Sequence, residues 1–508
     1  LMTGMPGVDD ASRANPMPHE HLPPCRRIAV CDTVRGGRNG RNRNVNVSSL
    51  NVSKHRSSQN EQPPVAVGFV SLGCAKNLVD SQVMAGTLLQ HGVELAPAPE
   101  DADVVVVNTC AFIEDARRES HDAIASVLEL KERGRCRAVV VAGCLPQRYP
   151  DRVREEFPSV DAWIGLDELS DIPAVVEKAL TGATPIVKVS SQPVRLYDPP
   201  VEALAFTGGP YAYVKIAEGC DHVCAFCAIP GIRGRHRSRP VASIVAEAES
   251  LLRAGYRELN LISQDVTSYG RDLAPPASLA ELLDALDALG EGFWVRLLYG
   301  YPSRLDARLL DAVASLPSVC HYFDVPIQHS HPDILRAMRR AETVAAVADL
   351  PRRVREAVPN ITLRTTCLVG FPGEREEHFE HLLDYVREAE FDHLGAFVFS
   401  PEAGTAAAEL PSRPPPDEAE ARRDRLMEAQ KRIVDRKAHA LRGATAIALL
   451  ERPAPRKKHR WIGRTERLAP EVDGDVIIDG VPADGRAGDL VEIRYVRQSG
   501  YDMVATCL

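Results

Sequence analysis

The chain has 508 residues, 44% of them hydrophobic, and a formal net charge of −9. This length exceeds a single compact core, so several domains are expected. The acidic balance argues against a protein that coats nucleic acid non-specifically, because such proteins are basic. The sequence lacks a run of about 18 apolar residues that would predict a membrane span, and it starts without the pattern of a secretory signal. We therefore expect a cytoplasmic protein whose 12 cysteines are reduced thiols.

The composition changes near residue 63. Residues 1–62 are polar and rich in Arg, Asn, Ser and Pro, which predicts a disordered extension. Short apolar strands then alternate with helical patterns, as in βαβ units that form a parallel sheet covered on both faces. We expect a flavodoxin-like domain over residues 63–180 and a Pro- and Gly-rich linker at 181–209. The clearest strands of this domain are VAVGFVSLG (65–73), VVVVNT (104–109) and AVVVAG (138–143).

A second alternating series begins at Tyr211. About six β/α units fit residues 210–440, as in a partial or complete β/α barrel, whose chemistry lies on loops at the carboxyl ends of the strands. A helical pattern from Pro416 to Arg442 leads to residues 441–508, where short strands and tight turns predict a small antiparallel β-barrel. The expected strands of the second series are YAYVKIA (211–217), ELNLISQD (258–265), WVRLLYG (294–300), YFDVPIQ (322–328), TLRTTCLVGF (362–371) and LGAFVFS (394–400).

Three cysteines after the first strand of this series carry the strongest signal. The stretch EGCDHVCAFCAIPGIRG places Cys220, Cys224 and Cys227 in a C-x3-C-x2-C array. Three closely spaced thiolates can hold three irons of a [4Fe–4S] cluster and leave the fourth iron open. S-adenosylmethionine (SAM) can chelate that iron, and an electron from the cluster then breaks its carbon–sulfur bond. A zinc site completed by His222 or a distant residue, or a thioredoxin-like redox pair, is the alternative.

Cys74, Cys110 and Cys144 form a second set. Each ends or follows a predicted strand, and their separations of 36 and 34 residues are about one βαβ period. In a parallel sheet the carboxyl ends of the strands lie along one edge, where ligands collect. A single such cysteine would be interpreted as a buried thiol, but three in equivalent positions predict a second [4Fe–4S] cluster with one open iron. The other cysteines lack such spacing, and we expect them to be structural.

These two motifs resemble a known family. The C-x3-C-x2-C array resembles the radical SAM superfamily, which implies that Cys220, Cys224 and Cys227 ligate the cluster that generates a 5′-deoxyadenosyl radical. Residues 65–508 as a whole resemble the methylthiotransferase family, which combines a cluster domain, a radical SAM domain and a C-terminal barrel called TRAM. Known members use a second cluster to deliver sulfur, and the resemblance implies this role for Cys74, Cys110 and Cys144.

The family has one branch that modifies tRNA adenosine and another that modifies an aspartate of ribosomal protein S12. The stretch SLGCAKNLVDSQ resembles SLGCPKNLVDSE of the S12 branch, where the tRNA branch has GCQMN. LISQDVTSYG likewise resembles ISQDTSAYG, and GRTERLAPEVDG resembles GRSxxDAPEIDG. From Arg442 onward eleven Lys and Arg face ten Asp and Glu, whereas an RNA-binding barrel should be clearly basic. We therefore expect S12 as substrate and partner, with tRNA adenosine as the alternative.

An aspartate β-carbon carries an unactivated C–H bond, so cofactor chemistry has to perform the hard step. The resemblance implies that one SAM methylates sulfur at the second cluster and that another supplies the radical. An external electron donor, such as a flavodoxin or ferredoxin, is also required. The residues expected to line the SAM pocket end or follow barrel strands, and they are Ser263, Gln264, Asp265, Gln328, Gly370 and Gly373.

Three of the expected pocket residues have a simpler alternative role, and so does the whole chain. Asp265 could instead cap a helix, and the glycines could belong to strand-end turns. Two further alternatives belong to different functional classes, a non-catalytic metal-containing RNA-binding protein and a redox protein that stores electrons on two clusters. Zinc without iron would favour the first, and failure to cleave SAM under reduction would favour the second.

Overall fold

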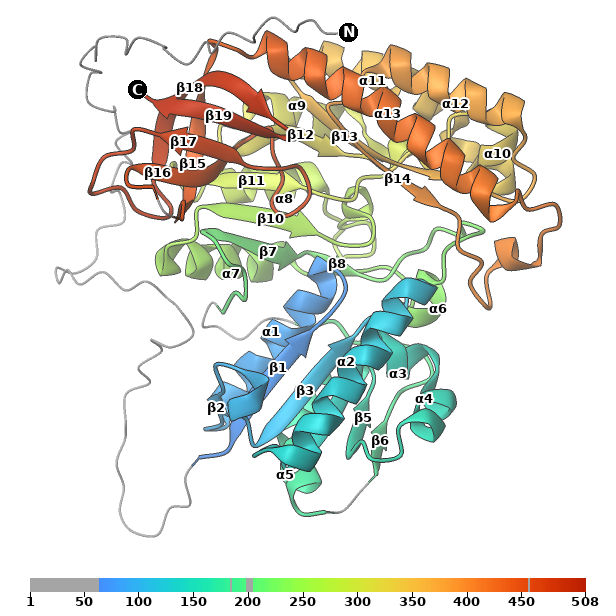
Figure 1. The fold of residues 1–508 in the computed structure, drawn as a ribbon, viewed down its shortest axis with the longest axis vertical. Helices are drawn as coiled ribbons and strands as arrows, with labels where there is room; N and C mark the ends of the chain where they lie inside the picture. Colours follow the sequence, from blue (N-terminus) through green and yellow to red (C-terminus); the bar gives the residue numbers. More distant parts are fainter. Residues whose placement is uncertain (1–63, 183–184, 198–203, 456) are drawn as a thin grey trace, which may run out of the picture.

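The computed structural model describes residues 64–182, 185–197, 204–455 and 457–508. The expected extension 1–62 lies outside the described residues, as does part of the expected linker. Figure 1 shows a first α/β domain below a second, larger α/β domain, with a small barrel against the second. Among the described residues, no helix combines the length and apolar character needed to cross a membrane.

The first domain is built on a six-stranded sheet in the order β2-β1-β3-β4-β5-β6, in which all neighbouring strands are parallel. Helices α1 and α5 pack on one face, and α2, α3 and α4 pack on the other, as expected for a flavodoxin-like fold. The strands are β1 (Ala66–Ser71), β2 (Glu94–Leu95), β3 (Val104–Thr109), β4 (Ala138–Gly143), β5 (Ala162–Ile164) and β6 (Ile186–Lys188). The helices are α1 (Ala75–Gln90), α2 (Glu114–Arg133), α3 (Cys144–Arg148), α4 (Pro150–Glu156) and α5 (Ile172–Leu180).

Strand β6 corrects the expected linker. Residues 186–188 were expected between the domains, but they pair with β5 and complete the first sheet. The strand is three residues long and follows Pro185, so it lacks the apolar length by which a buried strand is identified.

The second domain is an open, all-parallel sheet in the order β14-β13-β12-β11-β10-β7, which makes it a partial β/α barrel. Its strands are β7 (Tyr211–Lys215), β10 (Glu258–Ile262), β11 (Trp294–Leu297), β12 (Val319–Asp324), β13 (Thr362–Val369) and β14 (His393–Val398). The hairpin β8 (Ala217–Glu218) and β9 (Arg237–Ser238) brackets the C-x3-C-x2-C loop. The helices are α6 (Ile229–Arg233), α7 (Val241–Ala254), α8 (Leu279–Asp287), α9 (Ala307–Ser315), α10 (Pro332–Ala337), α11 (Val344–Ala357), α12 (Glu376–Ala389) and α13 (Pro416–Ala440).

Short 3-10 helices connect several of these elements. They are η2 (Pro99–Asp101), η3 (Leu166–Asp171), η4 (Val266–Ser268), η5 (Pro302–Arg304), η6 (Ala341–Thr343) and η7 (Ala406–Glu409). The core of the second domain lies between the sheet and its outer helices. Cys367 on β13 is fully buried in this core and therefore packs as a structural residue.

The third domain is a closed five-stranded barrel in the order β15-β16-β17-β19-β18. The strands are β15 (Thr445–Pro453), β16 (Arg460–Thr465), β17 (Val476–Asp479), β18 (Leu490–Ser499) and β19 (Asp502–Cys507). The barrel was expected to be antiparallel, but β17 and β19 pair in parallel. The reason is that β18 runs back between them in the chain and pairs with β15, which brings β19 beside β17 in the same direction.

Buried ion pairs attach this barrel to the second domain. Arg464 on β16 lies 2.6 Å from Glu258 on β10, and Arg296 on β11 lies 2.7 Å from the same carboxylate. Arg464 also contacts Glu451 at 2.6 Å. All these groups are almost fully buried, so the two domains share a polar core.

Candidate active site

The C-x3-C-x2-C loop is held at the carboxyl end of the barrel by backbone hydrogen bonds. Cys220 donates its N–H to the Gly234 carbonyl at 3.1 Å, and Cys227 donates to the Cys224 carbonyl at 3.1 Å. Ala225 donates to Met338 at 2.9 Å, which ties the loop to the end of α10. The three cysteines are free thiols on a loop whose backbone is fixed.

Aromatic and charged side chains surround this loop. His222 stacks on Tyr301 with ring centroids 3.7 Å apart, and its Nε2 lies 2.7 Å from Asp265. The guanidinium of Arg340 lies 4.3 Å from the Tyr301 ring centroid and donates to Cys224 Sγ at 3.8 Å. A positive charge therefore lies beside the sulfur of Cys224.

The expected pocket residues of the second barrel strand lie beside the loop. Asp265 caps η4 by accepting the Thr267 N–H at 2.9 Å, so the alternative role is present together with the His222 contact. Gln264 donates to Glu218 at 2.8 Å, and Ser263 is fully buried. Of the three, Asp265 contacts the loop through His222, and Gln264 contacts Glu218 just before the loop.

The other expected pocket residues, Gln328, Gly370 and Gly373, have different surroundings. Gln328 has a positive φ of 69° and its backbone bridges to Cys367 on β13. At Gly370 an added Cβ would lie 2.6 Å from Ala419 Cβ on α13, so its missing side chain makes room for a helix. Gly373 also has positive φ, but an added Cβ would meet nothing within 4 Å. The strand-end turn is thus present at both glycines, and only Gly373 borders open space.

The second cysteine set converges as the strand ends predict. Cys74 precedes α1, Cys110 directly follows β3, and Cys144 begins α3 after β4. Because β1, β3 and β4 are adjacent and parallel, their carboxyl ends lie side by side. Gly73 has a φ of +85°, and an added Cβ would lie 2.7 Å from Cys110 Cβ. The turn that carries Cys74 therefore packs directly against Cys110.

Burial raises the pKa of the Cys144, Cys220 and Cys227 thiols to about 12. The positive charge of Arg233 acts against this rise at Cys144. Free thiols in these positions keep their protons at neutral pH, so a metal has to displace the protons when it binds. Nine described cysteines, including all six of these, are free.

Neither cysteine set has the spacing of a single zinc site. Sulfur ligands of a tetrahedral zinc lie about 3.8 Å apart, because each Zn–S bond is about 2.3 Å. Within the described ranges, the one group of three ligand atoms closer together than 4.8 Å is His331, Asp333 and His378. Cysteine sulfur is the preferred ligand of a [4Fe–4S] cluster, and all six thiols are free.

A buried ion-pair network joins the two cysteine sets. Lys215 on β7 contacts Asp80 on α1 at 2.5 Å and Glu218 on β8 at 2.7 Å. Arg233 at the end of α6 lies 2.9 Å from Asp80 and 3.0 Å from Glu218. Two cations and two carboxylates thus balance one another across the boundary between the first and second domains.

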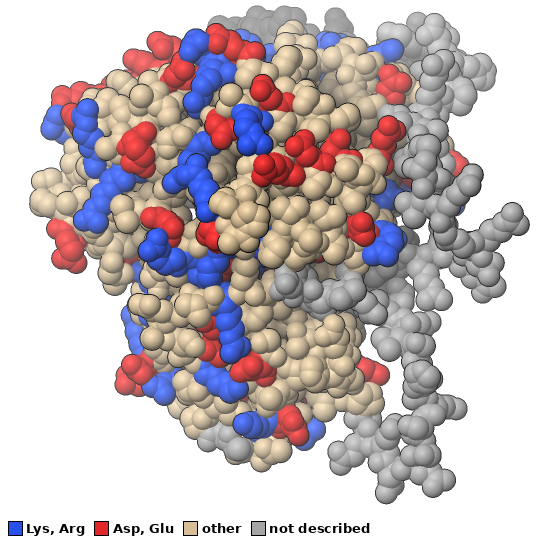
Figure 2. Space-filling view, turned by 180° about the vertical axis from the view of Figure 1, so that it is seen from behind, with Lys and Arg blue, Asp and Glu red and all other residues tan. Residues whose placement is uncertain are grey.

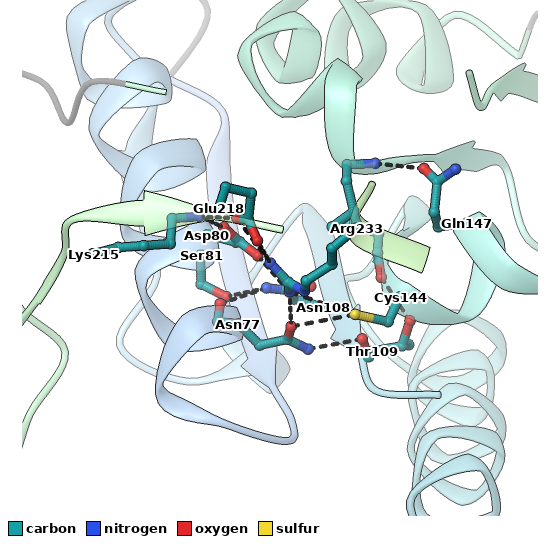
Figure 3. A network of polar contacts seen from close by, with 12 residues as sticks. Asn77, Asp80, Ser81, Asn108, Thr109, Cys144, Gln147, Lys215, Glu218 and Arg233 are labelled. Atoms are coloured by element: carbon teal, nitrogen blue, oxygen red, sulfur yellow. Dashed lines mark hydrogen bonds and ion pairs between the residues drawn. The ribbon is translucent and has the colours of Figure 1, made fainter. Parts of the chain in front are cut away.

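The same arginine extends to the second cysteine set, as Figure 3 shows. Its Nη2 donates to Cys144 Sγ at 3.4 Å and to Asn77 Oδ1 at 2.5 Å. Asn77 in turn donates to the Thr109 carbonyl at 2.8 Å. Through Glu218 and Gln264 the network also reaches the wall of the other site. Arg233 therefore contacts Cys144 directly and is linked to Gln264 through the carboxylate of Glu218.

Helix α1 of the first domain packs against the inner face of the barrel. On β7, Ala212 and Val214 face the outer helices, whereas Tyr211 and Tyr213 belong to a cluster with Val79 of α1. Lys76 of α1 reaches the end of β11, where its Nζ lies 3.0 Å from the centroid of the Tyr299 ring. The first domain thus closes the barrel beside its open edge.

Sequence reasoning missed the residues that connect the two sets. Asp80, Lys215, Glu218 and Arg233 attracted no attention because their partners are distant in the chain. The available signal was a charged residue inside an otherwise apolar element, such as Lys215 in YAYVKIA. A charge at such a position needs a buried partner, although the sequence does not identify that partner.

Comparisons with known proteins agree with this architecture. Residues 66–165 match the uncharacterized protein family UPF0004, residues 214–386 match the radical SAM superfamily, and residues 443–508 match the TRAM domain. The ribosomal protein uS12 methylthiotransferase RimO of Trichlorobacter lovleyi is 42% identical over 439 residues, covering 86% of this chain and 97% of the relative. The protein of the same name from Synechococcus sp. (strain RCC307) is 45% identical, covering 86% and 88%.

A solved structure shows a related fold. The radical S-adenosylmethionine methyltransferase TsrM from Kitasatospora setae, with cobalamin and a [4Fe–4S] cluster bound, has a TM-score of 0.52 at 16% identity, covering 68% of this chain and 74% of that chain. This likeness concerns the fold alone. The identity to full-length relatives carries more weight, and the chain belongs to the RimO family of radical SAM methylthiotransferases.

Proposed function

We propose that the protein adds a methylthio group to the β-carbon of an aspartate of ribosomal protein S12, using two [4Fe–4S] clusters and SAM. Cys220, Cys224 and Cys227 are proposed to hold the radical-generating cluster, and the other three converging cysteines the second cluster. The observation that supports this proposal is the buried network in which Arg233 contacts Cys144 and also Glu218, two residues before Cys220.

When bound, the clusters and SAM supply the carbon radical and the methylated sulfur. The chain itself supplies ligands, placement and exclusion of water. Arg340 and Arg233 place positive charge beside Cys224 and Cys144. Ser263, Gln264, Asp265, Gln328 and Gly373 are proposed to position SAM. Gly370 supports the same loop by allowing α13 to approach it.

The surface charges support a protein substrate over tRNA. On the TRAM barrel Arg460 is paired with Asp479 at 2.6 Å, and Arg452 with Asp475 at 3.0 Å. Figure 2 shows basic and acidic side chains interspersed over one face of the molecule. An RNA-binding surface requires unpaired basic groups, whereas a basic ribosomal protein can approach a mixed or acidic surface. The relatives' printed names also specify uS12.

Mass spectrometry of S12 tests the proposed substrate. S12 from cells that carry the gene should contain a methylthio adduct on one aspartate, and S12 from cells without it should not. An adduct on tRNA adenosine with unmodified S12 would instead establish the tRNA alternative. We also propose a cytoplasmic location, because ribosomes are there, and a flavodoxin or ferredoxin as the electron donor.

Iron analysis tests the two proposed clusters separately. Protein prepared without oxygen should hold about eight irons per chain, and Cys110→Ala and Cys224→Ala should each hold about four. Cys224→Ala should no longer cleave SAM under reduction, because it has lost a ligand of the radical-generating cluster. A wild-type protein with iron for a single cluster would contradict the second site while leaving the first intact.

A further inference from the structure

Lys76 is a buried cation that the ion-pair network does not use. Its residue is 7% exposed, and among the described residues no hydrogen-bond or ion-pair partner of its ammonium is found; the ammonium lies over the Tyr299 ring at 3.0 Å. A contact with an aromatic face offsets part of the desolvation of an ammonium but uses none of its three N–H donors. Lys76 can therefore donate its N–H groups to an anion.

The position of Lys76 places that anion between the two proposed clusters. Lys76 lies two residues after Cys74, a proposed ligand of the second cluster. Tyr299, beneath it, is two residues before Tyr301, which stacks on His222 of the C-x3-C-x2-C loop. One short segment at the end of β11 therefore contacts elements of both sites.

The backbone at this point is held firmly. Tyr299 has a φ of 69°, a left-handed conformation that is unfavourable for an aromatic residue. Its N–H donates to Asp324 Oδ2 at 3.1 Å, and Tyr301 N–H donates to Thr267 Oγ1 at 3.2 Å. The aromatic platform below Lys76 is thus fixed by two neighbouring strand ends.

We propose that Lys76 binds the carboxylate of the substrate aspartate and so selects aspartate as the target. This inference rests on the proposed function, in which the reacting β-carbon is bonded directly to that carboxylate. Lys215 and Arg233 are already neutralised by Asp80 and Glu218, and Arg340 lies at Cys224. Among the described residues, Lys76 is therefore the cation beside the second cysteine set that is available to compensate the incoming charge. In the GCQMN pattern of the tRNA branch the corresponding position is Met, which suits a substrate without a carboxylate.

The proposal is tested by measuring how tightly enzyme variants bind S12 variants, without any measurement of catalysis. Holoenzyme is titrated calorimetrically, without reductant, with S12 and with S12 whose target aspartate is replaced by asparagine. Wild-type enzyme should bind the aspartate form at least about tenfold more tightly, as expected for a hydrogen bond to a charged group. Lys76→Met should bind both forms about equally, and Lys76→Arg should restore part of the preference.

Controls separate this role from a structural one. Lys178→Met removes an exposed lysine of the same domain and should retain the full preference. Tyr299→Leu removes the aromatic platform but keeps the charge, so it should retain more of the preference than Lys76→Met; equal losses would show that Lys76 only clamps the domains. Iron content of each variant checks that both clusters are present.

Two further results would overturn the inference. The first is an undiminished preference in Lys76→Met, and the second is weaker SAM binding in Lys76→Met with no change in the preference, which would assign the lysine to the cofactor. Either result leaves the proposed function standing. Failure of the wild type to bind or modify S12 would instead remove the proposed function itself.

Discussion

At Gly73 one missing side chain makes the second cysteine set possible. An added Cβ would lie 2.7 Å from Cys110 Cβ and 3.0 Å from Cys110 Sγ, so Gly73→Ala has to push Cys110 away from its neighbours. We expect about four irons fewer per chain in protein prepared without oxygen, measured together with sulfide. The radical-generating cluster should remain, because its loop belongs to another domain.

Gly92→Ala is the matched control for this prediction. Gly92 also has a positive φ of 76°, but an added Cβ would meet nothing within 4 Å. Both substitutions should cost about 1–2 kcal/mol of stability, because left-handed backbone is unfavourable for alanine. Equal iron content in the two variants would show that the contact with Cys110 is unimportant.

Arg233 gives a second prediction at the residue scale. Arg233→Met leaves Asp80 and Glu218 with Lys215 as their shared cation, and breaking a buried charge network of this kind costs about 3–5 kcal/mol. The unfolding temperature should fall clearly. Arg235→Met is the control from the same loop, since Arg235 is exposed and pairs with one exposed aspartate, and its unfolding temperature should match the wild type. Similar temperatures for both variants would contradict a structural role for the network.

The cysteines and their partners differ in how far the sequence predicts them. The spacing of Cys220, Cys224 and Cys227 is local, so the array is visible in a single stretch of sequence. The other set is visible because each member ends a strand of the same sheet. Arg233 and Asp80 are 153 residues apart, and their contact depends on how two domains pack. Such contacts leave no pattern of spacing in one sequence.

Among the helices and strands, the extent of burial determined which strands could be predicted from the sequence. Strands β3 and β4 are buried at every residue and match the predicted ranges residue for residue. Strand β6 is short and half exposed, so its apolar content gave no signal. The parallel pairing of β17 with β19 was also missed, because alternation of polar and apolar residues indicates a strand without indicating its direction.

Helix α1 shows that packing between domains, like strand direction, could not be predicted from the sequence. The helical patterns expected between the strands of the first domain include this helix, and its residues Met84 and Leu88 pack against the first sheet. Its opposite face, with Val79, packs into the barrel of the next domain. The helix is therefore buried on two sides, which explains why polar residues such as Asp80 and Ser81 are also buried.

For the whole molecule, the attachment of the TRAM barrel should depend on pH. Burial alone would raise the pKa of Glu258, but Arg464 and Arg296 hold it below its ordinary value of 4.5. The unfolded chain therefore takes up this proton first as the pH falls, so the stabilisation is full above about pH 4.5 and declines below it. The unfolding temperature should drop between pH 5.5 and pH 4.0.

The variant Glu258→Gln measures how much of the acid sensitivity of the unfolding temperature is due to Glu258. The variant should be less stable at pH 5.5 and should show a smaller drop on acidification, because its amide cannot be protonated in this range. Glu249→Gln, at an exposed position of α7, should follow the wild type at both pH values. A wild-type-sized drop in Glu258→Gln would assign the acid sensitivity to other carboxylates.

The segment from Tyr299 to Tyr301 sets the separation between Lys76 and the C-x3-C-x2-C loop. It contacts Lys76 on one side and His222 on the other. The distance between Lys76 and the C-x3-C-x2-C loop is therefore set by a strand end and not by the length of the connection between the domains. Lengthening that connection should leave the distance between Lys76 and the C-x3-C-x2-C loop unaltered. The space available to a substrate is therefore determined by the strand ends of the barrel.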